Sequence, residues 1–136
     1  MFSKSNVLAT LAATIVLFLL GFLIWGVVMD DFFEQHAIGD SVKEHPDFTF
    51  IVLGNLFSAF AICTLYGQWA RGSHSAKQGA EFGIWIGVFV GLGLWFVQYA
   101  TTTIMSLTGY LVDAVLQMVY YAITGMVIAL VYKASS

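Results

Sequence analysis

The chain has 136 residues, of which 60% are hydrophobic and only 10% are charged, and its formal net charge is −3. A soluble domain of this length exposes a large part of its surface and needs polar residues to cover it, which this composition does not supply. The composition therefore excludes an ordinary soluble globular domain and predicts a protein whose solvent is lipid. The acidic balance and the lack of a basic cluster also argue against a nucleic-acid partner.

Four segments are apolar over a length that can cross a bilayer, because a transmembrane helix needs about 20 mainly apolar residues. We expect the spans at residues 7–29, 48–70, 80–100 and 108–131. A membrane β-barrel is disfavoured, because residues 11–28 form a continuous apolar run without alternation. The first span is too long for a removed signal peptide, so we expect it to remain as an anchor. The expected fold is a single all-α domain, an antiparallel up-down bundle of four transmembrane helices.

Positive charge is distributed unequally between the two sides of this topology. Lys4, Arg71, Lys77 and Lys133 fall on one side, whereas the first connection, residues 30–47, holds a single lysine among six acidic residues. Loops that carry most of the lysine and arginine stay in the cytoplasm. Both chain ends are therefore predicted to be cytoplasmic.

The tryptophans and the cysteine suggest structural roles. Trp25 and Trp69 fall near span ends, where the amphipathic indole is favoured at the headgroup level. Trp85 and Trp95 lie deeper in the third span, and we interpret them as packing residues that face neighbouring helices or lipid. The single cysteine, Cys63, falls inside the second span, which excludes an intramolecular disulfide and a dithiol redox site.

The third span carries glycines at every fourth position, namely Gly79, Gly83, Gly87 and Gly91. Glycines at this spacing form one smooth helix face, and in lipid such a face allows the backbone of a second helix to approach closely. We therefore expect a partner helix along this stripe, in the manner of a glycine zipper. The spacing leaves open whether that partner belongs to the same chain or to another copy in a homo-oligomer.

Polar residues within the spans define the candidate site. Asp113 is the acidic residue placed beyond the first turn of a span, and Gln117 and Tyr121 follow it at intervals of four on one helix face. We expect Asp113 near the outer end of its span, where water reaches it and a carboxylate costs less. Three further polar side chains in the outer halves of the second and third spans are expected to join this face: Asn55, Ser58 and Gln98. The cluster either bonds neighbouring helices or lines a path for an ion or a small solute.

The first connection contains histidines among carboxylates, which are ligand types that a divalent metal binds. The candidates are His36, His45 and Glu34. Their spacing matches no helical pair of metal ligands, so a solvated acidic loop is the competing interpretation. Every histidine falls outside the predicted spans, which disfavours a haem buried in the bundle. Nothing resembles a glycine-rich phosphate loop either, and we expect no cofactor.

Several short motifs are shared with a known group of proteins: Trp25-Gly26, Met29-Asp30-Asp31-Phe32-Phe33, Pro46-Asp47-Phe48, Val52-Leu53-Gly54-Asn55-Leu56, Gly79-Ala80, Tyr99-Ala100-Thr101-Thr102, Ser106-Leu107-Thr108-Gly109 and Leu111-Val112-Asp113-Ala114. In these motifs the sequence resembles a group of short bacterial four-span membrane proteins that share a domain of unknown function. The resemblance extends from about Gly21 to Val131. It implies a four-span topology in the bacterial inner membrane, and it implies no activity, cofactor or site residue.

Three functional classes remain open. The first is a non-catalytic membrane component, either a self-associating scaffold or an accessory subunit of a larger complex, because no nucleophile, base and orienting group form a recognisable set. The second is a small carrier or channel for an ion or a solute that uses the polar face of Asp113. The third is a metal-binding membrane protein, or a membrane enzyme, that uses the acidic outer loop. The lipid bilayer is a partner in all three.

Overall fold

The computed structural model of the protein describes residues 3–28, 32, 35, 48–101 and 105–135, which are almost entirely helical. Four helical stretches are long and apolar enough to cross a membrane, which confirms an all-helical protein with four candidate spans. Two of these stretches contain a π-helical segment, in which the backbone turn is wider than in an α-helix. The elements in chain order are α1 (Lys4–Gly21), η1 (Phe22–Val28), α3 (Phe48–Ala70), α4 (Ala76–Val88), η2 (Phe89–Leu94), α5 (Trp95–Thr101) and α6 (Leu107–Ser135).

The helix ends follow from local capping. The helix expected to begin at residue 80 begins at Ala76, because the Ser75 side chain caps it and accepts a hydrogen bond from the backbone N–H of Gln78 at 3.1 Å. α6 continues to Ser135, beyond the expected end at residue 131, and carries Lys133 in its last turn, where a cation is favoured by the helix dipole. α3 occupies the same residues as the second expected span.

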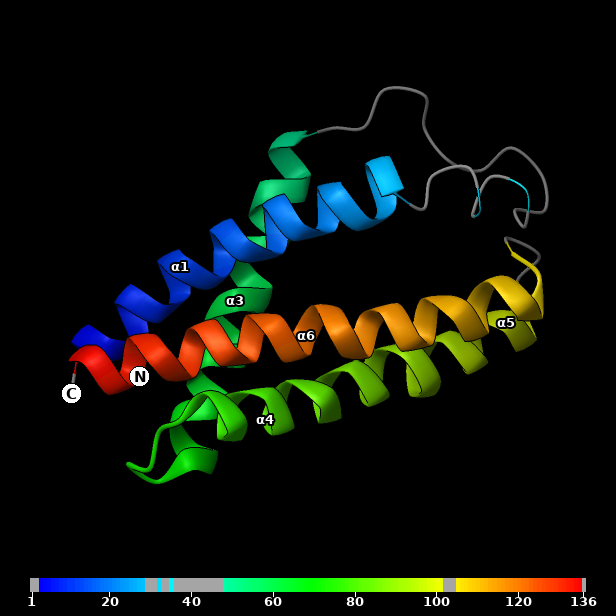
Figure 1. Ribbon diagram of the computed structural model, residues 1–136. Helices are drawn as coiled ribbons and strands as arrows, with labels where there is room; N and C mark the ends of the chain where they lie inside the picture. Colours follow the sequence, from blue (N-terminus) through cyan, green and yellow to red (C-terminus); the bar gives the residue numbers. More distant parts are fainter. Residues whose placement is uncertain (1–2, 29–31, 33–34, 36–47, 102–104, 136) are drawn as a thin grey trace.

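The helices are arranged around α6. α6 packs along α4 on one side and along α1 on the other, while α3 packs mainly against α1. α1, α4 and α6 run lengthwise beside one another, and α3 crosses them obliquely (Figure 1). The two chain ends lie next to each other, and the Ser135 hydroxyl donates a hydrogen bond to Ser5 Oγ at 2.7 Å. The oblique crossing leaves much of α3 outside the contact between the other helices.

The glycine stripe of the third span forms a seam with α6 of the same chain. A Cβ atom on Gly79 would overlap the carbonyl oxygen of Gly125, and one on Gly83 would overlap that of Tyr121, at separations well below the 3.0 Å limit of real Cβ contacts. At the other two members of the stripe, a Cβ on Gly87 would overlap the Met118 Cα atom, and one on Gly91 would lie 2.6 Å from the Ala114 Cα atom. Backbone therefore touches backbone along the whole seam, and the stripe is buried.

Cys63 is fully buried in the core between α1, α3 and α6. We expect the thiol to resist alkylation by a maleimide in the folded protein in mild detergent, because the reagent cannot reach it. Heating or strong detergent should expose it, so fluorescent labelling of this cysteine reports unfolding. Rapid labelling of the unheated protein would contradict the described packing.

Tyr120 connects α6 to α1, since its hydroxyl donates a hydrogen bond to the Leu17 carbonyl oxygen at 2.7 Å inside the core. Gly21 leaves room for this ring, because a Cβ there would lie 3.2 Å from the hydroxyl oxygen. We expect Tyr120→Phe to lower the free energy of unfolding by about 1 kcal/mol, the usual net value of one hydrogen bond. The temperature of Cys63 labelling measures the loss. Tyr99→Phe, at an exposed position, is the matched control and should leave that temperature unchanged.

Candidate functional site

The Asp113 carboxylate is the centre of the polar site. The side chain is only 5% exposed. Its Oδ1 accepts a hydrogen bond from Trp25 Nε1 at 2.5 Å, and its Oδ2 accepts one from Trp95 Nε1 and a third, at 3.3 Å, from Gln117 Nε2. Side chains from three spanning helices therefore meet at one carboxyl group. We call these four residues the Asp113 clamp.

Both tryptophans of the Asp113 clamp are positioned by π-helical backbone. Trp25 lies within η1, and Trp95 directly follows η2. A widened turn rotates the side chains that follow it relative to a regular α-helix, and such segments are frequent at functional sites. η2 also contains Gly91, where a Cβ would stand 2.6 Å from the Ala114 Cα atom, so η2 lies close to α6 directly before Trp95. The two π segments thus aim two indole N–H groups at one acceptor.

The donors of the Asp113 clamp supply the hydrogen bonds that lipid cannot give to the Asp113 carboxylate. In hydrocarbon a carboxylate without partners is costly, and hydrogen bonds to a charged acceptor are about twice as strong as neutral ones. The lysine and arginine residues that the structure describes lie near the opposite ends of the helices, so in this part of the chain the carboxylate relies on N–H donors. Hydrogen bonds to the Asp113 carboxylate therefore connect three spans of the same chain.

The structure brings together part of the predicted polar cluster. Gln117 bonds Asp113, as the spacing of four residues predicts. Tyr121 lies on the same face, with its ring edge-on to Tyr120 at 4.9 Å between centroids. Gln98 is half-buried on α5, three residues after Trp95.

Asn55 and Ser58 lie apart from the Asp113 clamp. Both belong to α3, where Asn55 is half-buried and Ser58 is exposed. The hydrogen bonds found between described residues connect neither of them to Asp113. The sequence predicts all these residues in the outer halves of their spans, but α3 packs mainly against α1, whereas α6 packs along α4 and α1.

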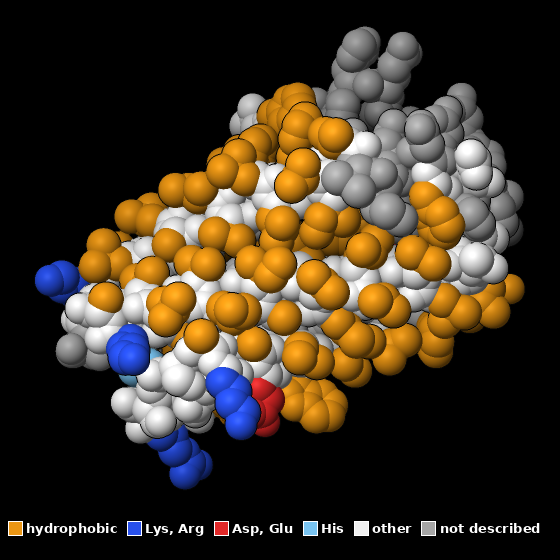
Figure 2. Space-filling view, viewed as in Figure 1, with side chains coloured by type: hydrophobic (Ala, Val, Ile, Leu, Met, Phe, Trp, Pro, Cys, Tyr) orange, Lys and Arg blue, Asp and Glu red, His pale blue; other side chains and the backbone are white. Residues whose placement is uncertain are grey.

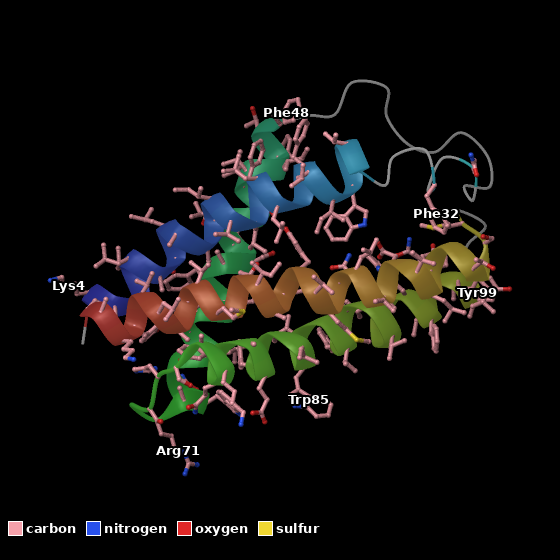
Figure 3. The ribbon with its side chains drawn as sticks, viewed as in Figure 1. Lys4, Phe32, Phe48, Arg71, Trp85 and Tyr99 are labelled. Carbon is pink, nitrogen blue, oxygen red and sulfur yellow. The ribbon has the colours of Figure 1, made fainter. Side chains whose placement is uncertain are left out.

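One sequence interpretation is wrong and a second was incomplete. Water was expected to reach Asp113, whereas the carboxylate is buried and bonded by protein donors. Trp95 was interpreted as a packing residue, and its ring does lie 6.2 Å from that of Tyr110 on α6, but its indole N–H also donates a hydrogen bond to Asp113. The chemistry of indole could have indicated the donor role of Trp95. Indole is a large apolar group that also carries an N–H donor, so a buried tryptophan usually has an acceptor nearby. Trp85 does behave as expected, since it projects from α4 away from the other helices and is 65% exposed (Figure 3).

Tyr110 adds an unexplained polar group beside the site. Its side chain is 2% exposed, and its hydroxyl has no hydrogen-bond partner in the described part of the chain. The ring lies 6.2 Å from that of Trp95, one helical turn before Asp113.

The metal hypothesis rests on residues that the structure does not describe. His36, His45 and Glu34 lie outside the described residues. Within the described ranges, no group of three histidine, cysteine or acidic side chains could hold a metal ion.

Together, the four apolar helices and the Asp113 clamp define a small, all-helical, multi-pass membrane protein with a cross-linked intramembrane carboxylate. No family model, curated protein or solved structure matches the chain.

Proposed function

We propose that the protein is a non-catalytic component of the bacterial inner membrane, a four-span antiparallel bundle with both ends in the cytoplasm, which associates with a second copy of itself through α3. The observation that carries this proposal is the polar pair of α3, the half-buried Asn55 and the exposed Ser58, on a helix apolar enough to span the membrane. The sequence resemblance to short bacterial four-span proteins supports the location.

The outer half of α3 is largely exposed, although the Phe48 ring lies 6.2 Å from that of Phe18 on α1. Residues 48–58 are exposed, except for the half-buried Asn55, and a Cβ added at Gly54 would meet nothing within 4 Å. Neither Asn55 nor Ser58 makes a side-chain hydrogen bond to another described residue. Lipid tails offer no hydrogen bonds, so polar groups at this depth are stabilised when another helix covers them. Small residues on the same face allow close approach, and Ala61 continues that face.

A second copy is a suitable partner for this face. An asparagine amide both donates and accepts hydrogen bonds, so two such amides can pair with each other. A two-fold axis along the membrane normal places identical residues of two copies at the same depth. α3 carries no charged residue from Phe48 to Ala70, so two copies meet without repulsion between like charges.

The rest of the structure is consistent with a non-catalytic role. Both oxygens of Asp113 accept hydrogen bonds from protein donors, so the carboxylate connects helices by hydrogen bonding. The glycine stripe is buried against α6 and leaves no room for a second copy there. Self-association therefore has to use another surface, and α3 offers polar and small residues together.

Disulfide formation across the proposed interface tests this function. In a Cys63→Ala background, we expect Ser58→Cys to give covalent dimers when membranes are mildly oxidised, because the two-fold axis brings this position close to its copy. Val115→Cys, at an exposed position on α6, is the matched control and should stay monomeric. In the Ser58→Cys protein, Asn55→Leu should reduce the dimer yield. Equal dimer formation at positions 58 and 115 would mean random collision and would rule the proposal out.

A second candidate function, a carrier for an ion or a small solute, is favoured by the buried Tyr110 hydroxyl. This group and the Asp113 clamp place several polar atoms close together within the outer half of the protein. Proteoliposomes loaded with a proton-sensitive or potassium-sensitive dye provide the test. Flux should depend on Asp113, so a flux that survives both Asp113→Asn and Gln117→Leu would exclude this route.

A further inference from the structure

A polar pocket opens at the end of the helices where the two chain ends meet. Its volume is about 260 Å³. Its lining comes from the start of α1, the end of α3 and the end of α6: Ser3, Asn6, Thr64, Gly67, Gln68 and Tyr132. All of these residues except the glycine carry a hydroxyl or an amide group. The pocket lies far along α6 from the Asp113 clamp and is separate from it.

Hydrogen bonds fix the walls of this pocket. Asn6 Nδ2 donates to Thr64 Oγ1 at 3.2 Å, which joins α1 to α3. The Thr64 hydroxyl donates to the Phe60 carbonyl oxygen, and the Tyr132 hydroxyl donates to the carbonyl oxygen of Cys63 at 3.0 Å. Gly67 lies against the Tyr132 side chain, since a Cβ at this position would lie 2.9 Å from the Tyr132 hydroxyl oxygen. The pocket is thus a formed feature of the helix packing.

Hydrogen-bond donors line the opening, and two lysines are adjacent in sequence to lining residues. The hydroxyl groups of Thr64 and Tyr132 already donate hydrogen bonds to backbone carbonyl oxygens. The Ser3 hydroxyl and the exposed Gln68 amide are therefore the donors that a ligand can use. Lys4 follows Ser3, and Lys133 follows Tyr132; both lysines are exposed.

Lysine and arginine side chains gather at this end of the molecule (Figure 2), where Lys4 and Arg71 are labelled in Figure 3. The described carboxylate at this end, Glu81, lies on α4, one turn after Lys77 and beside it on the same helix face. The positive charge that the structure describes is therefore concentrated at the end of the helices where the pocket opens, while the charge of Lys77 is partly balanced.

We propose that this pocket binds the phosphodiester headgroup of an anionic phospholipid in the adjacent leaflet. A phosphodiester is an anion with several acceptor oxygens, which suits the hydroxyl and amide donors and the two flanking lysines. The lining helices continue into lipid-facing surfaces that expose Leu8, Leu11 and Leu65, along which acyl chains can lie. These surfaces favour a lipid over a free phosphate ion.

Native mass spectrometry of the full chain in mild detergent tests this assignment. Phosphatidylglycerol and phosphatidylcholine with identical acyl chains are titrated separately, and we expect phosphatidylglycerol to be retained more tightly. Lys4→Gln combined with Lys133→Gln should weaken its binding by about thirtyfold, because each cation near an anionic lipid contributes about 1 kcal/mol. Gln68→Leu, which removes a donor without changing charge, should weaken it as well.

Lys77→Gln is the matched control, since it removes one positive charge at the same end of the helices but away from the pocket, and it should bind like the unmodified protein. Equal affinity for the two lipids would overturn the proposal. So would a loss in Lys77→Gln equal to that in the double lysine variant, because binding would then depend on surface charge alone. Displacement of the lipid by inorganic phosphate would assign the pocket to a free anion and would also overturn it.

Discussion

Gly83→Ala should destabilise the folded protein by about 3 kcal/mol, at the upper end of the range for overpacking a well-packed core. The added methyl group would overlap the carbonyl group of Tyr121, and the backbone of a helix cannot rotate away as a side chain can. α4 and α6 must separate locally, and the neighbouring contacts of the seam are then lost. The measurement is the temperature at which Cys63 becomes accessible to a fluorescent maleimide in detergent.

Gly93→Ala is the matched control for this substitution. Gly93 belongs to the same span, but the nearest heavy atom to its Cβ position is the Val88 carbonyl oxygen at 3.9 Å, an ordinary contact distance. This variant should label at the temperature of the unmodified protein. If Gly83→Ala behaved in the same way, the described contact between α4 and α6 would be wrong.

Asp113→Ala should lower the free energy of unfolding by about 3 kcal/mol. The substitution leaves the N–H groups of Trp25, Trp95 and Gln117 without their acceptor, and each unsatisfied buried donor costs about 1–3 kcal/mol. Part of this cost will be recovered as the side chains shift. Cys63 labelling again gives the size of the effect.

Two further measurements separate the Asp113 clamp from a general packing defect. In ¹⁵N–¹H spectra, the indole signals of Trp25 and Trp95 should shift in Asp113→Ala, while that of the exposed Trp85 should not. In a double-mutant cycle, Trp95→Phe and Asp113→Ala together should cost at least about 1 kcal/mol less than the sum of the two single effects, because they remove the same interaction. Strict additivity would show that the two side chains do not interact.

Composition and apolar run length were sufficient to predict the class of fold. The required length of an apolar run depends on the thickness of the bilayer, which is the same for every span. The spacing of Asp113 and Gln117 was also informative, because residues four apart on a helix are neighbours in any fold. The glycine spacing predicted a closely packed face, and the structure shows α6 on that face.

The arrangement of the helices was much harder to predict. Spanning helices are apolar on nearly every side, so periodicity does not show which face packs and which meets lipid. Asn55 and Ser58 belong to α3, which packs mainly against α1, and within the described residues they make no hydrogen bond to Asp113, although all three were expected at a similar depth. The role of Trp95 depends on the π-helical segment before it, and no pattern in the sequence indicated that widened turn.

The neighbouring positions of the two chain ends affect how self-association is measured. Ser5 and Ser135 touch through their hydroxyl groups, so tags attached to the two ends of one chain emerge side by side. The two halves of a split fluorescent reporter, placed on the same molecule, would reassemble without any dimer. A reliable complementation assay therefore carries each half on a separate chain.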